Sequence, residues 1–178
     1  FQVTRIPNSE VALYIFDLHL RALIIKSMAV IEHELQLHLG VLQTNKRFVS
    51  FGTLRKRVFT MPVEVHQGIA IAFGCRNSRE FSSLLLNFNE ARNTAAHHAR
   101  FWNRNFHFAI PKRFVSHGFE NFGRAKSSNS TAAFLTALHQ VLQTCPPFLE
   151  LKNELDDLVK ACPVNRGIIL GRMGFEAA

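Results

Sequence analysis

The most extended pattern in the chain is a stripe of large apolar residues near its start. These residues recur three, four or seven positions apart, which places them on one side of an α-helix. They are Leu13, Phe16, Leu20, Ile24, Ile31, Leu35 and Leu39. Asn8 or Ser9 can cap such a helix, and Glu10 stands in its first turn. The pattern predicts one long helix from about Glu10 to Leu42, with polar positions that include Asp17, Arg21, Lys26, Glu32 and Glu34.

Four shorter helices are predicted along the rest of the chain. They extend from Pro62 to Gly74, from Asn77 towards His98, from Ser128 or Ser130 to Thr144, and from Pro147 to the break at Pro163. Proline in the first turn and glycine after the last turn are typical helix ends, as in the first of the four. The second carries Phe81, Leu84, Leu85 and Phe88 on the side that we expect to be buried.

The remaining segments lack helical periodicity and are predicted to be irregular. Thr44–Arg57 is a polar and basic connector, and Asn105–Ser130 is a long basic loop that contains two glycines. The C-terminal segment NRGIILGRMGFEAA is rich in glycine and apolar residues, so we expect it to pack against the body. Because apolar and polar residues nowhere alternate over a sustained run, the sequence predicts an all-α fold, with one helical domain over residues 1–178.

The composition is that of a folded and strongly basic domain. Of the 178 residues, 47% are hydrophobic and 19% are charged, which argues against a disordered chain. The net charge of +8 favours a polyanionic partner such as nucleic acid, with general solubility as the alternative. The apolar runs are short and interrupted, so we expect no transmembrane helix and no membrane partner.

The cysteine content bears on the cellular compartment of the protein, and the first residue bears on whether the sequence is complete. Cys75, Cys145 and Cys162 show no CxxC spacing, so neither a disulfide framework nor a zinc knuckle is indicated, and a reducing cytoplasm is expected. The chain begins at Phe1 rather than at methionine and shows no signal peptide. We therefore expect a fragment or an incomplete N-terminus.

A dense cluster of cationic, amide and aromatic residues follows the second of the shorter helices. The stretch ARNTAAHHARFWNRNF, Ala91–Phe106, contains Arg92, Asn93, His97, His98, Arg100, Trp102, Asn103 and Arg104. Cleavage of RNA needs a base for the 2′-hydroxyl, positive charge on the phosphorane-like transition state, and an acid for the leaving 5′-oxygen. Histidine can serve as the base or the acid, and arginine offers a fixed fork of donors to phosphoryl oxygens. The cluster therefore predicts a candidate ribonuclease site.

Spacing alone does not identify the reacting residues. Arginine is followed by histidine after four to six residues three times, as Arg92 with His97, Arg92 with His98, and Arg100 with His107. No carboxylate cluster accompanies them, as a two-metal nuclease would require. A zinc site of His97, His98 and His107 lacks a fourth protein ligand at suitable spacing, so we expect no metal and no cofactor.

The string RNTAAHHARFWNRNF resembles the signature of the abortive-infection (Abi) family of bacterial phage-resistance proteins. In that signature Arg-Asn, a small residue before His-His, Arg and Trp-Asn-Arg follow one another. LYIFDLHLRALIIKSMAVIEHELQLHLG, FGTLRKRV and RMGF resemble other segments of the family, so the similarity extends from about Leu13 to Phe175. The family is similar to the HEPN (higher eukaryotes and prokaryotes nucleotide-binding) superfamily, whose helical bundles carry an R-x4-6-H motif.

The resemblance implies a HEPN-like helical bundle that cuts RNA without a metal, as a toxin-type phage-defence protein. It makes Arg92 and His97 the catalytic pair and Asn93 their polar neighbour. His98, Arg100, Asn103 and Arg104 match family positions without a separable role. It also implies a homodimer, because such sites in relatives commonly take one motif from each of two protomers. A protein or RNA antitoxin is a further expected partner, and the N-terminal region that relatives carry before the long helix is absent here.

Two basic segments are predicted to contact the RNA backbone. Their residues are Lys46, Arg47, Arg55, Lys56 and Arg57 in the first, and Lys112 and Arg113 at the start of the second, which continues to Lys126. Basic residues with interleaved aromatics can hold a backbone and stack on bases, although a solvated loop with phenylalanine anchors has the same pattern. Two other interpretations stay open: a noncatalytic RNA- or protein-binding helical module, and a buried polar network around Arg92 and His97.

Overall fold

The computed structural model describes residues 8–41, 49–116, 118–119, 121–146 and 150–176. These residues form eight helices: α1 (Asn8–His38), α2 (Phe51–Phe59), α3 (Val63–Ala72), α4 (Ser78–Ala96), α5 (Lys112–Ser116), α6 (Thr131–Leu142), α7 (Leu151–Ala161) and α8 (Arg166–Met173). Within these ranges the only β-type pairings are three isolated bridges, so the all-α prediction is confirmed. No helix in the described ranges combines the length and the apolar character needed to cross a membrane.

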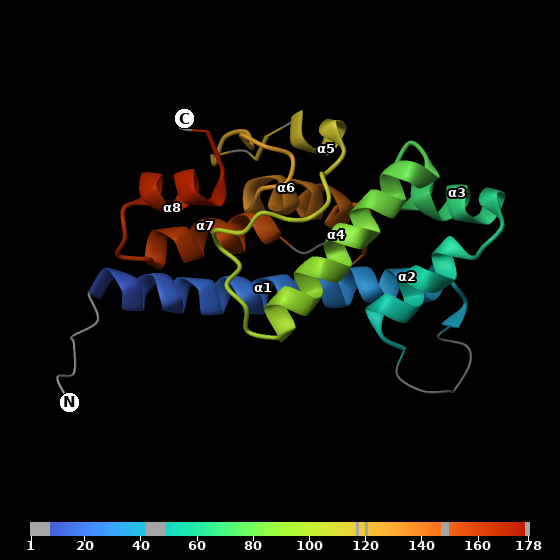
Figure 1. Cartoon of the computed structure of the whole chain (residues 1–178), viewed down its shortest axis with the longest axis horizontal. Coiled ribbons are helices and arrows are strands. Elements are labelled where there is room, and N and C mark those ends of the chain that lie inside the picture. Colours follow the sequence, from blue (N-terminus) through green and yellow to red (C-terminus); the bar gives the residue numbers. More distant parts are fainter. Residues whose placement is uncertain (1–7, 42–48, 117, 120, 147–149, 177–178) are drawn as a thin grey trace.

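The long helix α1 lies along one side of the molecule and supports most of the others (Figure 1). Helices α2, α4, α6 and α7 pack against it, and α8 packs on α6 and α7. Its apolar stripe is buried from Phe16 to Leu35, as its spacing predicted. The helix ends at His38, and Gly40 then adopts a left-handed φ of 63°, a conformation that glycine allows at low cost. The expected end at Leu42 lies outside the described residues.

Helix α4 crosses α1 and contains the first part of the cluster singled out in the sequence, Ala91–Ala96 (Figure 1). The Asn77 side chain accepts a hydrogen bond from the Glu80 backbone N–H and begins the helix. Its buried side includes Phe81, Leu84, Leu85 and Phe88, as predicted. The helix ends at Ala96, because the backbone of His97 is no longer helical and His98 has a positive φ of 57°. The two histidines therefore lie where the chain turns out of the helix.

Two segments predicted to be irregular contain helices. Helix α2 occupies the second half of the Thr44–Arg57 connector, because Ser50 caps it and Phe51, Leu54 and Val58 form a short buried stripe. Helix α8 lies in the C-terminal segment, where Ile169, Leu170 and Met173 are buried. The expectation that this segment packs against the body is confirmed. The prediction that Thr44–Arg57 is an irregular connector is wrong from Phe51 onwards.

The segment between α4 and α6 is mainly irregular, as predicted, but it is firmly packed. It contains the short helix α5, and its aromatic residues Phe106, Phe114, Phe119 and Phe122 are buried in the core. Backbone hydrogen bonds also join Phe106 to Asn129, and Ile110 to Ser128. The predictions of helices at 62–74 and 130–144 are confirmed by α3 and α6, and α7 confirms the helix before Pro163, whereas Pro147 lies outside the described residues.

Candidate functional site

A buried carboxylate on α1 fixes the turn that follows α4. Asp17 Oδ1 accepts hydrogen bonds from the backbone N–H groups of Phe101 and Trp102, both at 2.8 Å. Its other oxygen, Oδ2, lies 3.1 Å from Nε of Arg21, one helical turn along α1. Asp17 and Arg21 are 5% and 4% exposed, so this ion pair is shielded from water. The two residues therefore attach the segment after His98 to the long helix.

The same ion pair orients His98. A terminal nitrogen of Arg21 lies 3.2 Å from Nδ1 of His98. A guanidinium only donates hydrogen bonds, so Nδ1 accepts and the neutral imidazole carries its proton on Nε2. The residue is exposed at the end of α4, so this Nε2–H group is accessible to a ligand. His98 is thus held as a hydrogen-bond donor at the surface.

Arg92 and His98 line one hollow between α1 and α4. This hollow has a volume of ≈ 670 Å³, which is in the range of small-ligand sites. Its walls also include Arg21, Glu32 and small residues such as Ala22, Ala29, Ala95 and Ala96. Burial raises the pKa of the Glu32 carboxyl, and the positive charge of Arg92 opposes that rise. Arg92 is half-buried and lies near Glu32.

The two ends of this hollow are marked by different residues of α1. His98 is bonded to Arg21, whereas Arg92 acts on Glu32. Arg21 and Glu32 are eleven positions apart in α1, which corresponds to roughly 16 Å along a helix at 1.5 Å per residue. Within one chain, Arg92 and His98 therefore share a hollow but lie towards its opposite ends.

His97 and Asn93 line a second hollow on the other side of α4. This hollow has a volume of ≈ 470 Å³ and is also lined by Arg55, Glu90, Arg104 and His107. The predicted pair Arg92 and His97 thus face different hollows in the single chain. The reason is helical geometry, since five residues correspond to a rotation of about 140° at 100° per residue. Asn93 is exposed and accompanies His97 rather than Arg92.

Glu90 organises the charged groups of this second hollow. Its Oε1 accepts hydrogen bonds from Arg104 Nη2 at 3.0 Å and lies 2.9 Å from Nδ1 of His107, while Oε2 accepts from the His107 backbone N–H at 3.1 Å. Burial alone would raise the pKa of Glu90, but these bonds from His107 and Arg104 outweigh it and lower the pKa. The charge of Arg104 is therefore largely neutralised by Glu90.

The remaining members of the predicted cluster lie apart from Arg92. Arg100 and Asn103 are exposed in the turn after α4. Trp102 is 5% exposed and belongs to the core, and the guanidinium carbon of Arg172 lies 5.8 Å from the centre of its ring. His107 is bound to Glu90, so it does not meet Arg100.

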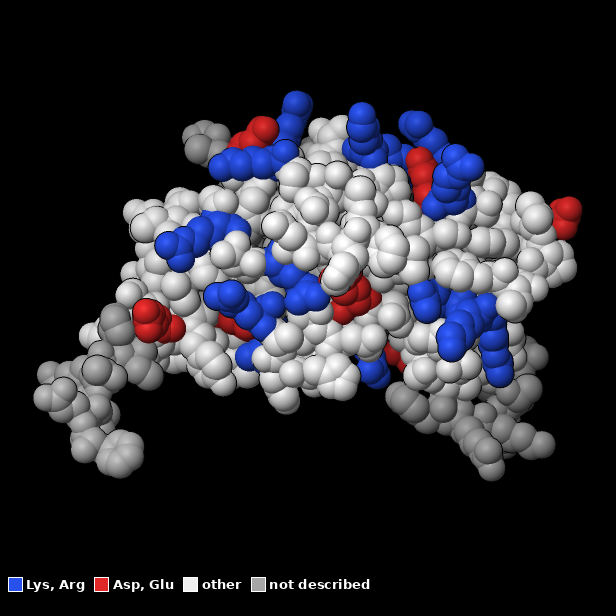
Figure 2. Space-filling model, in the orientation of Figure 1, with Lys and Arg blue, Asp and Glu red and all other residues white. Residues whose placement is uncertain are grey.

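Five of the seven residues named as RNA-backbone contacts lie on α2 and α5, and Figure 2 shows Lys and Arg side chains over both helices. Lys56 and Arg57 are exposed on α2, and Arg55 reaches the second hollow, where its Nε atom is buried without a hydrogen-bond partner among the described residues. On α5, Lys112 is exposed, whereas Arg113 donates to Glu80 at 3.1 Å. Lys46 and Arg47 lie outside the described residues.

No group of three or more histidine, cysteine, aspartate or glutamate side chains that could hold a metal ion occurs in the described part of the chain. The most relevant residues that sequence reasoning missed are Asp17 and Arg21, which were grouped with the polar positions of α1. The sequence contained a signal for them, because the two are four residues apart and each directly follows an apolar residue of the buried stripe, Phe16 or Leu20. Their partners lie more than seventy positions away, and periodicity carries no information about such distant contacts.

Comparison with known proteins gives one match. Residues 45–103 match the family model described as Abi-like protein, a segment that contains α2, α3, α4 and the turn after it. No curated protein and no solved structure matches the chain. The matched segment includes Arg92, Asn93, His97 and His98, and the chain is similar to the Abi-like proteins over this segment.

Proposed function

We propose that this chain is a metal-independent endoribonuclease of a bacterial abortive-infection system. In this proposal Arg92 binds the phosphate to be cleaved, His97 is the catalytic histidine that the family motif indicates, and Asn93 is its polar neighbour. The observation that carries the proposal is that Arg92, His98 and the Arg21 that orients it line one hollow beside the end of α4. The similarity to Abi-like proteins over residues 45–103 supports the defence role.

The chemistry requires two proton transfers and stabilisation of negative charge. A histidine removes the proton of a ribose 2′-hydroxyl, and the oxygen attacks the adjacent phosphorus while the bond to the 5′-oxygen breaks. The arginine fork binds the phosphoryl oxygens as their charge increases. A protonated group then supplies the proton of the leaving 5′-oxygen. The products are a 2′,3′-cyclic phosphate and a 5′-hydroxyl.

The geometry gives the two histidines different roles. Nδ1 of His98 is occupied by Arg21, so its neutral ring presents Nε2–H, which suits a hydrogen-bond donor to a phosphoryl oxygen. His97 is exposed and has no hydrogen-bonded side-chain partner among the described residues, so its imidazole is accessible to a 2′-hydroxyl. We therefore add His98 to the proposed site as a hydrogen-bond donor to the phosphate, and propose that His97, once protonated by the 2′-hydroxyl, returns that proton to the leaving 5′-oxygen.

A second copy of the chain is part of the proposal, because one copy does not bring Arg92 close to either histidine. The outer side of α1 carries an exposed apolar stripe next to the Arg92 hollow. Its members alternate at spacings of four and three, the pattern of a helix–helix seam: Val11, Ile15, Leu18, Ala22, Ile25 and Ala29. Four of them also line the hollow itself.

An antiparallel pairing of two such stripes would complete the site. The Glu32 end of one α1 would then lie opposite the Arg21 end of the other, so that Arg92 of one copy faces His98 of the second. A twofold arrangement of this kind produces two equivalent sites, each with residues from both copies. Burial of the stripe would supply the association energy, since apolar area removed from water is stabilising.

The proposed activity is tested by incubating the purified chain with single-stranded RNA in excess EDTA. We expect cleavage at the same rate with EDTA as with Mg²⁺, and products that end in a 2′,3′-cyclic phosphate. The same oligonucleotide with 2′-O-methyl groups throughout should remain intact, because it lacks the attacking hydroxyl. Intact RNA in EDTA, with cleavage restored by a divalent ion, would contradict the metal-independent mechanism.

A second candidate function is a noncatalytic RNA- or protein-binding module. It is favoured by one observation, the position of Arg92 and His97 in separate hollows of a single chain. A binding module would bind RNA with similar affinity whether or not the 2′-hydroxyls are methylated, and it would release no cleaved product. The assay in EDTA therefore separates the two functions.

A further inference from the structure

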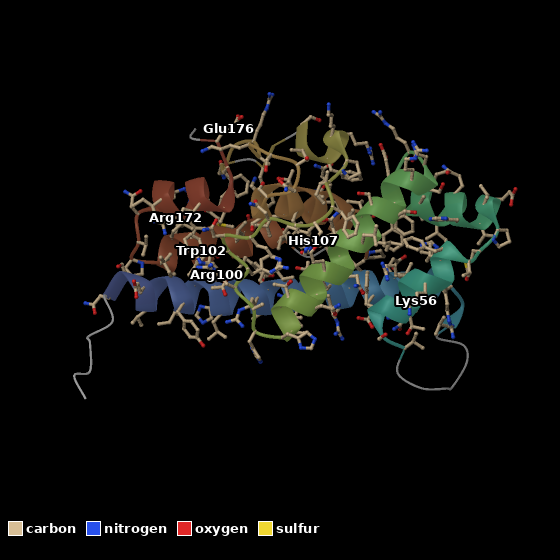
Figure 3. All side chains as sticks on the ribbon, viewed as in Figure 1. Lys56, Arg100, Trp102, His107, Arg172 and Glu176 are labelled. Atoms are coloured by element: carbon tan, nitrogen blue, oxygen red, sulfur yellow. The ribbon has the colours of Figure 1, made fainter. Side chains whose placement is uncertain are left out.

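A third hollow lies beside the Arg92 hollow and shares two residues with it. It has a volume of ≈ 370 Å³ between the first half of α1, the turn after α4 and the end of α8. Arg21 and His98 line both hollows, so the two are adjacent along α1. Figure 3 shows Arg172, Trp102 and Arg100 following one another between α8 and α1. Apart from Arg21 and His98, no residue of this hollow takes part in the proposed cleavage.

Two of its arginines have charges without a carboxylate partner. Arg100 and Arg172 are exposed, and neither forms an ion pair within the described part of the chain. Asp17 lies at the base of the hollow, but Arg21 and the two backbone N–H groups of Phe101 and Trp102 already bind it. The other acid is Glu10, in the first turn of α1. The hollow therefore has an excess of positive charge.

The hollow also contains an aromatic side chain that is open to solvent. Tyr14 is 66% exposed and lines the hollow on its α1 side. Trp102 forms the floor, and Arg172 lies over its ring, which holds the guanidinium above the hollow. A cationic groove beside an exposed aromatic ring has the features of a single-strand nucleic-acid subsite, in which phosphate binds arginine and a base stacks on the ring.

We propose that this hollow binds a phosphate of the RNA strand that neighbours the cleaved phosphate, with Arg100 and Arg172 as its ligands and Tyr14 as a stacking surface for the adjoining base. This inference rests on the proposed ribonuclease function, because the phosphate it concerns belongs to the RNA strand that enters the proposed site at His98. It adds the C-terminal helix α8 to the substrate-binding surface. The hollow would align the strand so that the cleaved linkage reaches Arg92 and the histidines.

The test measures the salt dependence of binding to a 2′-O-methyl single-stranded oligonucleotide, which cannot be cut. Each phosphate neutralised by the protein contributes about 0.7 to the slope of log Kobs against log salt for single strands. If both arginines bind one phosphate, Arg100→Gln and Arg172→Gln should each weaken binding, and the double variant should lower the slope by about 0.7 rather than twice that value. Tyr14→Ala should weaken binding without changing the slope.

Matched controls keep the result interpretable. Arg79→Gln removes an exposed arginine at the start of α4, away from this hollow, and should change neither affinity nor slope beyond a nonspecific shift. Because Arg172 packs on Trp102, thermal unfolding is measured for each variant, and the exposed Arg100 gives a variant with little structural effect. Inorganic phosphate at constant ionic strength should compete with the oligonucleotide in the wild type and not in the double variant.

An unchanged salt slope in the double variant would overturn the subsite. An equal loss in Arg79→Gln would also overturn it, since the effect would then be one of total charge. Competition by inorganic phosphate together with an unchanged RNA slope would indicate a site for free phosphate alone and would likewise overturn it. These outcomes are separate from failure of the ribonuclease proposal, in which wild-type protein would leave unmodified RNA intact while still binding the oligonucleotide.

Discussion

Replacing Arg92 with alanine should reduce RNA cleavage by roughly 10²–10³-fold, the loss expected when one preorganised donor to the transition-state charge is removed. The side chain is half-buried, and no hydrogen bond or ion pair within the described residues ties it to the core, so folding should be preserved. Arg92→Lys should recover part of the rate, because lysine keeps the charge but not the two-pronged geometry. Single-turnover cleavage, with thermal unfolding measured in parallel, gives the comparison.

The histidine variants show which ring transfers the protons. His97→Ala should abolish cleavage if the motif spacing identifies the catalytic residue, and His98→Ala should slow it because the Nε2–H donor is lost. Arg79→Ala is the matched control for removal of an arginine from the surface of α4. Cleavage by Arg92→Ala at the parental rate would exclude this hollow as the reaction site.

Replacing Asp17 with alanine should cause the largest loss of stability among single substitutions near the site. The change leaves Arg21 as an uncompensated buried charge and removes the acceptor of the Phe101 and Trp102 N–H groups. Breaking a buried ion pair from one side costs about 3–5 kcal/mol. For a chain of this size, that corresponds to a decrease of about 10 °C in the thermal midpoint. Thermal unfolding followed by far-UV circular dichroism, which reports helix content, would measure this decrease.

Two further variants separate the parts of this effect. Asp17→Asn keeps an oxygen that can accept the backbone hydrogen bonds but removes the charge, so its loss should be intermediate. Asp157→Ala removes an exposed carboxylate of α7 and should shift the midpoint by no more than a degree or so, about the range of ordinary surface substitutions. A midpoint for Asp17→Ala equal to that of Asp157→Ala would contradict the anchoring role of Asp17.

Much of the fold follows from local sequence signals. Helices α1, α4 and α6 have long apolar stripes, and Asn77 and Ser130 cap α4 and α6, so their positions could be predicted closely. Helix α2 was missed because its three adjacent basic residues hide a short stripe of Phe51, Leu54 and Val58. Helix α8 was missed because Gly167 and Gly171 lower its helix propensity. It is stabilised by the Asn165 side-chain cap and by packing against α6 and α7.

The positions of the candidate site residues along the fold were predictable from the sequence, but their arrangement in space was not. The sequence placed Arg92, Asn93 and both histidines at one helix end, and the structure has them there. Which hollow each side chain faces depends on where α1 crosses α4 and on where α4 ends, and both are long-range features. Likewise, the restraint of His98 by Arg21 joins residues 77 positions apart, which no local pattern encodes.

Co-expression of two inactive variants tests the shared ribonuclease site most directly. Arg92→Ala and the double variant His97→Ala/His98→Ala should each leave RNA intact in EDTA. In a random mixture, half of the dimers contain one copy of each and retain one complete site of two, so the mixture should cut RNA at about a quarter of the wild-type rate. A mixture as inactive as its two components, beside an active wild type, would contradict a site formed by two copies, and RNA left intact by the wild type would contradict the ribonuclease itself.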